Sequence, residues 1–299
     1  MKKSSSENQN TLVRSTIPNF SKLRENNAIT PEGVMLFQKA IYDYFEHNKR
    51  EFSWRNTINP YHIVVSEIML QQTQTHRVKD KFEQFINRFP TIQDLAHSSL
   101  GDVLALWQGL GYNRRGQSLH LFAQRVVNEF NGIIPRTPEI LQTFKGIGPA
   151  TASSICAFAY NSPTVFIETN IRAVFIHLFF HNLDKIPDHD IQPLVAQTLD
   201  LVNPRIWYYA LMDYGVMLKK LYPNPSKKSA HHTIQSKFEG SDRQIRGLIL
   251  RILLKQSLLS LSEMVTLINK DREKIIKIAT DLVNEKLIDC INNVYTLPI

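Results

Sequence analysis

The sequence predicts a predominantly α-helical protein, and three observations support this. Apolar residues recur at helical spacing in most segments, as at Val34, Phe37 and Ile41. The sustained alternation that is typical of a strand is confined to the end of the chain. An apolar content of 43% and a charged content of 21% over 299 residues are typical of a globular protein with room for two domains.

Residues 1–30 are polar and lack periodicity, so we expect a flexible tail. A helix is expected after Thr30, because Pro31 suits the first helical position and Glu32 places an acid in the first turn. The basic start of the chain is followed by no apolar stretch, which argues against a signal peptide. The longest apolar run, near Val174, is too short to span a bilayer. We therefore expect a cytoplasmic protein without a membrane partner.

An acid interrupts the apolar helix expected from Tyr61 to about Gln72. Glu67 has two interpretations: a solvent-facing or ion-paired residue, or a buried acid with a raised pKa that donates a proton. The amides at the helix end, Gln71 and Gln72, can read base edges or fill a vacated place in a duplex.

A second tight turn follows two further helices, which are expected at 75–88 and 91–97. Its glycines, Gly109 and Gly111, would project Tyr112 ahead of two arginines. An aromatic side chain beside arginines suits a wedge between stacked bases near phosphates, although a packed surface ring is also common at turns.

A helix, hairpin and helix follow around residues 141–160. Gly146 and Gly148 permit positive φ and a close backbone approach, and Pro149 suits the start of the next helix. Backbone N–H groups at a helix start bind phosphate. Glu168 then precedes a further helix. A hairpin that grips a DNA backbone, followed by a carboxylate at a helix start, indicates an enzyme that excises bases.

The net charge of +8 is concentrated in one region. Between Lys219 and Lys255 lie nine Lys or Arg residues and two acidic residues. Such a band favours a polyanion through counterion release, and the alternative is a solvated linker. The two cysteines, Cys156 and Cys290, exclude a four-cysteine zinc or iron–sulfur site, and no metal site is expected.

Residues 242–299 are expected to form a small winged-helix-like domain. Three helices are expected, the second opened by a capping box of Ser260 and Glu263 and the third capped by Asp271. The chain would then turn in a hairpin at Asn292-Asn293. DNA reading, packing and dimerisation are the alternatives for a third helix that carries Arg272, Lys274 and Lys277.

Four motifs in order, PYH…SEIMLQQTQ, LWQGLGY, GIGPATAS and IETN, resemble the helix–hairpin–helix DNA glycosylase superfamily. The sequence is most similar to the MutY-type adenine DNA glycosylases and more distantly to endonuclease III, over roughly residues 31–220. The resemblance implies two helical lobes, 31–58 plus 188–220 and 60–187. A basic linker, 221–241, would replace the family's iron–sulfur loop, so no cofactor is expected.

The resemblance also implies roles for single residues. Glu67 would protonate the departing adenine, Glu168 would stabilise the sugar cation, and Tyr160 and Asn170 would line the sugar side. The implied base pocket contains Trp54, Arg55, Tyr209 and Met212. Residues expected to contact DNA are Leu70, Gln71, Gln72, Thr73, Tyr112, Arg114, Arg115, Gly146, Gly148, Thr151, Lys227 and Lys228.

The chain departs from the family at three positions that bear on chemistry. Glu168 replaces an Asp, Tyr209 replaces a Glu or Gln, and Ala150 stands where strand-nicking relatives carry Lys. The resemblance therefore implies a monomeric, monofunctional glycosylase that flips adenine out of duplex DNA, opposite guanine or 8-oxoguanine. Excision of thymine, uracil or hypoxanthine, and a DNA-binding protein without catalysis, are the alternatives.

Overall fold

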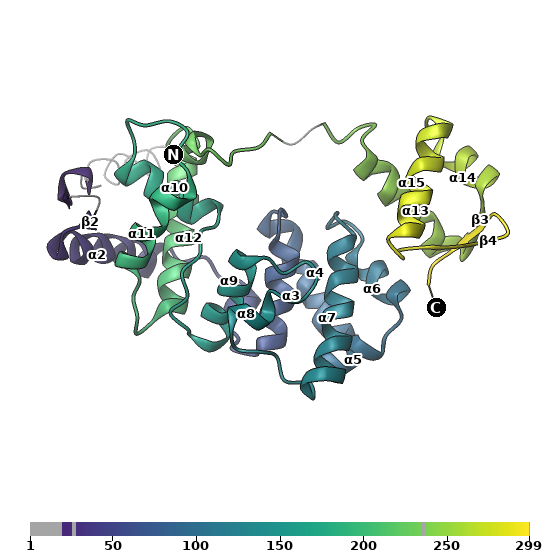
Figure 1. The fold of residues 1–299 in the computed structure, drawn as a ribbon, viewed down its shortest axis with the longest axis horizontal. Helices are drawn as coiled ribbons and strands as arrows, with labels where there is room; N and C mark the ends of the chain where they lie inside the picture. Colours follow the sequence, from purple (N-terminus) through teal and green to yellow (C-terminus); the bar gives the residue numbers. More distant parts are fainter. Residues whose placement is uncertain (1–19, 26–27, 235–236, 299) are drawn as a thin grey trace, which may run out of the picture. The chain divides into compact units, whose positions relative to one another are not determined.

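The computed structural model describes residues 20–25, 28–234 and 237–298, and it is predominantly helical, as the sequence predicts (Figure 1). The chain divides into two compact units, Met1–Glu51 with Cys156–Ile234 and Phe52–Ile155 with Gln235–Ile299. Among the described residues, no helix combines the length and the apolarity needed to cross a bilayer.

In the first unit, α10 packs on α12 and α11, and α2 packs on α12. Phe37 of α2 contacts Phe175, Phe179 and Trp207, so an aromatic cluster forms the centre of this unit. The short helix η3 packs against α10. The bounds of these elements are α2 (Pro31–Asn48), α10 (Thr169–Phe179), α11 (Asp188–Thr198), α12 (Pro204–Leu221) and η3 (Pro225–Lys228).

The prediction of a flexible tail is wrong for the part of residues 1–30 that the structure describes. Residues 20–25 and 28–29 form η1 (Phe20–Leu23), β1 (Arg24–Glu25) and β2 (Ala28–Ile29), with β1 and β2 antiparallel. Phe20 is fully buried, with its ring centroid 5.4 Å from that of Phe37. An apolar residue in a polar stretch therefore anchors it to the core. Residues 1–19 of the expected tail lie outside the described residues.

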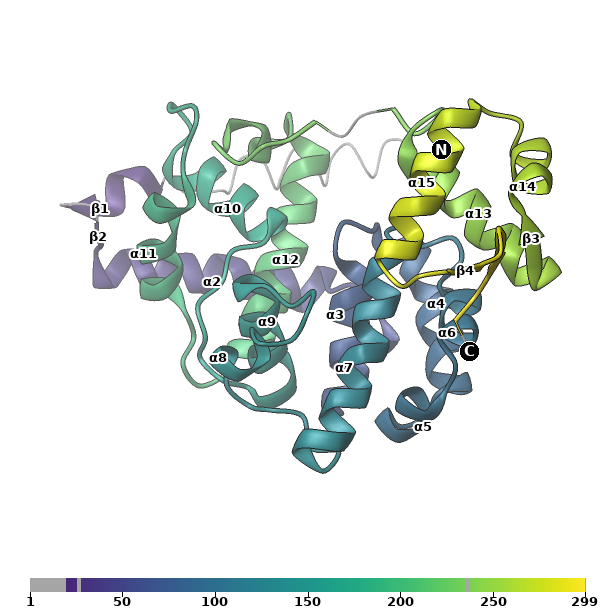
Figure 2. The same cartoon turned by 45° about the vertical axis from the view of Figure 1, so that its right-hand side comes forward.

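The second unit contains a helical bundle in which α7 packs on α3, α5 and α6 (Figure 2). The helices expected at 75–88 and 91–97 are present. The helix expected to reach Gln72 ends at Leu70, because Gln72 adopts a positive φ of 52°. The bounds are η2 (Ser53–Arg55), α3 (Pro60–Leu70), α4 (Thr75–Arg88), α5 (Ile92–His97), α6 (Leu100–Trp107), α7 (Arg114–Phe130) and α8 (Pro138–Leu141).

The division between the units differs from the expected lobes, because it falls inside α9 (Pro149–Tyr160), between Ile155 and Cys156, rather than near residue 187. Hydrogen bonds account for this position. The start of α9 is bonded to Gln71 of the second unit. The carbonyls of Phe158 and Ala159, near its end, accept hydrogen bonds from Arg205 of the first unit.

Residues 242–297, here called the C-terminal module, group with the second unit rather than standing apart. The expected capping box at Ser260 and the cap at Asp271 are present. Asn292 and Asn293 adopt positive φ at the expected hairpin turn. The short strand β3 was not expected, and it completes an antiparallel sheet of order β3-β5-β4. The bounds are α13 (Asp242–Gln256), β3 (Leu258–Ser260), α14 (Leu261–Ile268), α15 (Arg272–Asn284), β4 (Asp289–Ile291) and β5 (Val294–Thr296).

Candidate functional site

The hairpin between α8 and α9 presents its glycines at the surface, while Ile147 between them is buried. Gly146 has a φ of +86°, and a Cβ there would lie 2.9 Å from Cβ and Oγ of Ser118. At Gly148 a Cβ would meet no described atom within 4 Å. The exposed turn leads directly into the N-terminus of α9, where backbone N–H groups are available to an anion.

The end of α3 is tied to this hairpin. Nε2 of Gln71 lies 3.1 Å from the carbonyl oxygen of Gly146 and 3.1 Å from Oγ1 of Thr151, and it donates to both. Three residues predicted to contact DNA are thus joined by direct hydrogen bonds. Leu70, before Gln71, is half-buried at the last position of the helix.

Glu67 is half-buried on α3 and accepts a hydrogen bond from a residue that the sequence analysis missed. Oγ of Ser154, on α9, lies 2.5 Å from Oε2 of Glu67 and 3.0 Å from the carbonyl oxygen of Thr151. The short distance is typical of a hydroxyl bonded to a carboxylate. Ser154 follows Thr151 by three residues on a helix, so the two share a face; this spacing was the available signal.

The Ser154 hydroxyl suits either protonation state of Glu67. A hydroxyl has one hydrogen and two lone pairs. It can donate to the ionised carboxylate, or accept from the neutral acid while its own hydrogen turns to the Thr151 carbonyl. The hydrogen bond is therefore compatible with a proton-donating role for Glu67, which stays a prediction.

Trp54 and Arg55, expected in the base pocket, lie on η2. Trp54 is buried and stacks on Phe52 with a centroid distance of 4.6 Å and an interplanar angle of 5°. Its ring also meets the edge of Phe82. The Arg55 guanidinium lies 5.3 Å from the Phe52 ring centroid. These contacts fix both residues beside the bundle, and their contact with a base stays a prediction.

Two loop tips carry residues in the left-handed region of φ. Gln72 and Tyr112 have φ values of 52° and 49°, which are uncommon for residues other than glycine and often mark functional loops. Gln72 is exposed, and Tyr112 is 37% exposed. Both side chains are therefore accessible, as residues that enter a duplex must be.

Arg115 holds these two loops together. Its Nη1 donates to backbone carbonyls at the end of α3. These carbonyls lack partners within the helix because they belong to its last turn. Its Nη2 donates to the turn that carries Tyr112. The guanidinium also lies over the rings of Trp107 and Tyr112, and burial lowers its pKa to about 10. Its acceptors are Ile68, Met69, Gln71, Leu110 and Gly111, through their carbonyls, and the hydroxyl of Thr73.

Four basic residues expected to contact DNA differ in their contacts within the protein. Arg115 is bonded to loop acceptors, and Arg114 pairs with Glu285 of the C-terminal module. Lys227 and Lys228 lie on η3 in the first unit, where Nζ of Lys228 donates to the carbonyl oxygen of His181 at 2.7 Å. Arg114, Arg115 and Lys228 therefore make contacts within the protein, Lys227 is exposed, and the contacts of all four with DNA stay predictions.

Glu168 caps α10 in the first unit. Its Oε1 accepts from the backbone N–H of Asn170 at 2.7 Å and of Ile171 at 2.9 Å. Nδ2 of Asn170 donates to its Oε2 at 3.1 Å. The carboxylate therefore lies at the positive end of a helix dipole, held by three donors.

Lys219 and Gly215 of α12 complete this arrangement, and the sequence analysis assigned neither. Nζ of Lys219 donates to Oδ1 of Asn170 at 3.0 Å. Burial lowers the pKa of Lys219, and the nearby Glu168 carboxylate opposes that shift. A Cβ at Gly215 would lie 2.3 Å from the backbone oxygen of Asn170, so α12 and α10 can approach this closely only at a glycine. In the sequence, only the position of Lys219 within the basic band indicated a role for this residue.

The remaining predicted residues of the first unit are held by packing. Tyr160 is half-buried at the end of α9, and Arg205 bonds the preceding carbonyls of that helix. Tyr209 is 6% exposed and stacks on Phe158 at 4.6 Å and 7°. Met212 is half-buried on α12. Contact of Tyr209 with a base edge stays a prediction.

Within the part of the chain that the structure describes, no group of three or more His, Cys, Asp or Glu side chains is placed to hold a metal ion. Cys156 is buried in the first unit and Cys290 is exposed in the second.

Comparison with known proteins identifies relatives of this chain. A family model described as HhH-GPD superfamily base excision DNA repair protein matches residues 65–193. An adenine DNA glycosylase of Mycobacterium tuberculosis is 30% identical over 257 residues, which cover 75% of this chain and 82% of that protein. An adenine DNA glycosylase of Rattus norvegicus is 34% identical over 194 residues, which cover 61% of this chain and 38% of that protein.

A solved structure described as a thermostable thymine-DNA glycosylase shares the fold, with a TM-score of 0.57 and 22% identity over 63% of this chain and 88% of that one. The chain matches less than two thirds of the length of some curated relatives, such as the 38% of the rat protein and 53% of a Buchnera aphidicola adenine DNA glycosylase.

Proposed function

The chain belongs to the HhH-GPD superfamily of base excision DNA repair proteins and, within it, to the adenine DNA glycosylases, and from this premise we propose that it removes adenine from mispairs in duplex DNA. One observation carries most of the proposal. The helix that bears Glu67 is hydrogen-bonded through Gln71 to an exposed glycine hairpin, and through Ser154 to α9, which follows that hairpin. The Glu67 carboxyl is thereby held at a fixed position beside a surface that is suited to bind a DNA backbone.

Glu67 is the proposed general acid. Adenine leaves its sugar more readily when a ring nitrogen is protonated, because the departing base would otherwise carry the negative charge. The Ser154 hydroxyl supports Glu67 before and after the proton moves, as its hydrogen-bonding capacity allows. This hydrogen bond is compatible with the proposed proton transfer.

Glu168 is the proposed stabiliser of the positive charge that develops on the sugar. Such a carboxylate must be ionised and preorganised, so that it does not need to move as charge develops. Three donors hold it, two from the backbone of α10 and one from Asn170. Glu168, although longer by a methylene than Asp, is held by these donors at the start of α10, and we propose that activity is retained.

Water is the proposed nucleophile. Ala150 follows Pro149 in the first turn of α9 and is exposed, so this position offers no amine for a covalent intermediate. Lys145 precedes the hairpin glycines and is also exposed. The expected product is an abasic site in an uncut strand.

We further propose that the protein works without an iron–sulfur cluster, because a chain with two cysteines cannot supply four thiolate ligands. The segment that follows α12 has its own contacts. Oγ of Ser226 donates to the carbonyl oxygen of Thr169 at 2.9 Å, and the N–H of Ile186 donates to the carbonyl of Lys228 at 2.9 Å. These bonds support residues 225–230 as a structural replacement for a cluster loop.

Excision of thymine opposite guanine is the second candidate, because the environment of Tyr209 does not favour adenine. A stacked, buried tyrosine stands where the resemblance implies a polar side chain against the adenine edge. Without that side chain, the preference for adenine has less support than the excision chemistry.

A single-turnover assay on duplexes with A:8-oxoG, A:G, T:G, U:G and hypoxanthine:T pairs, with and without alkali, tests these proposals. We expect the fastest release from A:8-oxoG or A:G, with strand cleavage only after alkali. Preferred release from T:G would select the second candidate, and release from none would refute excision. Strand cleavage without alkali would refute the proposal that water is the nucleophile.

A further inference from the structure

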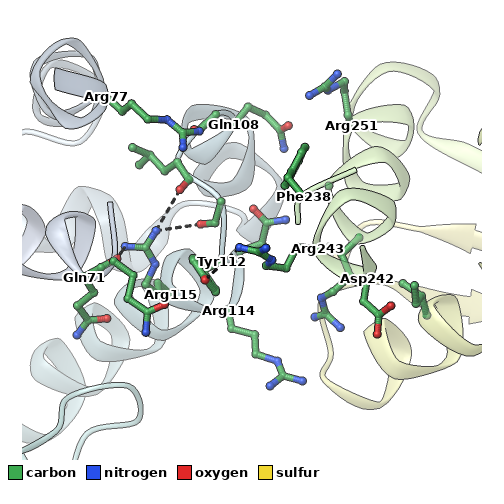
Figure 3. A pocket seen from close by; sticks show the side chains of 18 of the residues that line it. Gln71, Arg77, Gln108, Tyr112, Arg114, Arg115, Phe238, Asp242, Arg243 and Arg251 are labelled. Carbon is green, nitrogen blue, oxygen red and sulfur yellow. Dashed lines mark hydrogen bonds between the residues drawn. The ribbon is translucent and has the colours of Figure 1, made fainter. Parts of the chain in front are cut away.

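A groove of about 830 Å³ lies within the second unit, between the two loop tips and the C-terminal module (Figure 3). One wall is made by Gln71, Gln72 and the turn from Gly109 to Arg115. The other is made mainly by α13 and by Phe238, which precedes it. The loops that were predicted to enter DNA therefore face a wall that belongs to a part of the chain without an assigned role.

The groove is basic. The described residues that line it include six arginines and only two aspartates. Asp242 pairs with Lys274 at 3.1 Å, and Arg114 and Arg246 both pair with Glu285. With these partners included, positive charges still outnumber negative ones around the groove. The lining also presents two accessible aromatic rings, Tyr112 at 37% and Phe238 at 61% exposure. Arginines interleaved with accessible aromatic rings are typical of surfaces that bind nucleic acid.

The α13 wall is fixed to the bundle by a half-buried carboxylate. Arg114 of α7 and Arg246 of α13 both pair with Glu285 at the end of α15. Nε2 of Gln117, also on α7, donates to the backbone carbonyls of Glu285 and Lys286 at 2.8 Å and 2.9 Å. The module is therefore attached to the helix that begins beside Tyr112.

Apolar packing adds to this attachment. Leu100 and Leu104 of α6 belong to the same buried cluster as the inner face of α13, including Ile249 and Leu253. The ion pairs and the shared apolar core together hold the α13 wall at a constant distance from the loops. The groove is therefore preorganised for its ligand.

The basic residues of the C-terminal module that line the groove are not the ones that the sequence suggests. The third helix, α15, was expected to be a candidate for reading DNA through Arg272, Lys274 and Lys277. Lys274 instead donates to the Gly240 carbonyl at 2.6 Å, and none of the three residues lines the groove. Arg243 and Arg251 of α13 line it, and Nη1 of Arg243 lies 3.5 Å from Oη of Tyr112 (Figure 3).

We propose that this groove binds duplex DNA beside the mispair, with Arg243 and Arg251 of the C-terminal module contacting backbone phosphates while Tyr112 and Gln72 enter the duplex. The inference rests on the proposed function for the role of the two loops. The phosphate contacts of α13 are additional to it, and they assign the C-terminal module to DNA binding through its first helix.

The proposal is tested by fluorescence anisotropy, which measures the affinity for a DNA duplex over a range of salt concentrations. The duplex carries 2′-fluoro-deoxyadenosine opposite 8-oxoguanine, because this nucleotide resists hydrolysis. For the double variant Arg243→Ala/Arg251→Ala, we expect affinity to fall on the order of 10-fold, and the slope of log K against log salt to become shallower by about 1.8, as each phosphate contact contributes about 0.9. The matched control, Arg272→Ala/Lys277→Ala, removes equal charge from exposed positions on α15 outside the groove and should retain affinity.

Wild-type affinity and slope in the groove variant would overturn the proposal, and so would equal losses in both double variants, which would indicate a diffuse charge effect. Thermal melting of each variant checks folding, and the single substitution Arg251→Glu at an exposed position provides a second variant if the double one melts early. Binding is read without excision. A wild-type protein that binds but releases no adenine from A:8-oxoG would therefore refute the proposed function and leave the groove assignment standing.

Discussion

The ammonium of Lys219 lies 3.0 Å from Oδ1 of Asn170, and this contact determines which way the Asn170 amide faces. A lysine ammonium only donates, so it holds the amide oxygen and leaves the NH₂ group to donate to Glu168 at 3.1 Å. Lys219 is therefore a positioning residue for the proposed catalytic carboxylate.

Replacing Lys219 with Met keeps an unbranched side chain but removes the donor. The Asn170 amide is then free to turn its oxygen toward Glu168, and we expect the single-turnover excision rate to fall about 10-fold, which equals about 1.4 kcal/mol at the transition state. DNA affinity measured on the uncleavable duplex should change little, and Lys219→Arg should restore most of the rate. A Lys219→Met protein with the wild-type rate would contradict the positioning role.

Gly215→Ala tests the close approach of α12 to α10. The new Cβ would lie 2.3 Å from the backbone oxygen of Asn170, so the helices must separate. Overpacking of this kind typically costs about 1–3 kcal/mol, and we expect a loss of this size in the free energy of unfolding measured with urea. The matched control is Gly247→Ala in α13, where a Cβ meets no described atom within 4 Å. That substitution should be neutral or stabilising by up to about 1 kcal/mol, since alanine favours a helix.

The start of α2 shows how far local chemistry can be predicted from sequence. The order Thr30, Pro31, Glu32 predicts a capped helix start, and Oγ1 of Thr30 accepts the N–H of Gly33 at 3.1 Å. The capping box at Ser260 and the turn at Asn292-Asn293 follow the same logic. Each depends on residues within four positions of one another, which is why pattern alone predicts them.

Contacts between distant segments could not be predicted in this way. Arg115 was expected to contact DNA, and the structure shows that several of its acceptors, such as Ile68, lie more than forty residues earlier in the chain. Phe20 gave no periodic signal, yet it is buried in an aromatic cluster. Ser154 beside Glu67 and Lys219 beside Asn170 depend on how whole helices pack. The sequence therefore predicted most of the helices and the candidate carboxylates, but not the residues that position them.

Ser154→Ala tests the proton-handling role of the Glu67 pair. The hydroxyl donates to the ionised carboxylate at 2.5 Å and thereby stabilises it. Without that donor the neutral acid is favoured, so we expect the alkaline limb of the pH–rate profile to move to higher pH. Ser153→Ala, at the neighbouring half-buried position, is the control. An unchanged alkaline limb in Ser154→Ala would show that the hydroxyl does not act on the titrating acid.

The lowered pKa of Glu285 predicts that the stability of the protein depends on pH. Burial acts to raise the pKa of Glu285, but hydrogen bonds from Arg114 and Arg246 outweigh it and lower the pKa to about 2. A carboxyl whose pKa is lower in the folded state contributes stability above its unfolded value of 4.5, and this stability is lost as the pH falls from there toward 2.

We therefore expect the urea midpoint of the wild type to fall over this pH range, and Glu285→Gln to flatten that part of the dependence. Glu273→Gln, at an exposed position of α15, is the control. Equal pH dependence in the wild type and in Glu285→Gln would contradict the role of the pair of arginines.

The central claim is that Glu67 donates the proton on which adenine release depends. The most direct measurement is the single-turnover release of adenine from an A:8-oxoG duplex by the wild type and by Glu67→Gln, with binding to the uncleavable duplex measured in parallel. We expect the wild type to release adenine, and Glu67→Gln to lose at least about 100-fold in rate while it retains DNA affinity. Release of adenine by Glu67→Gln at the wild-type rate would contradict the claim.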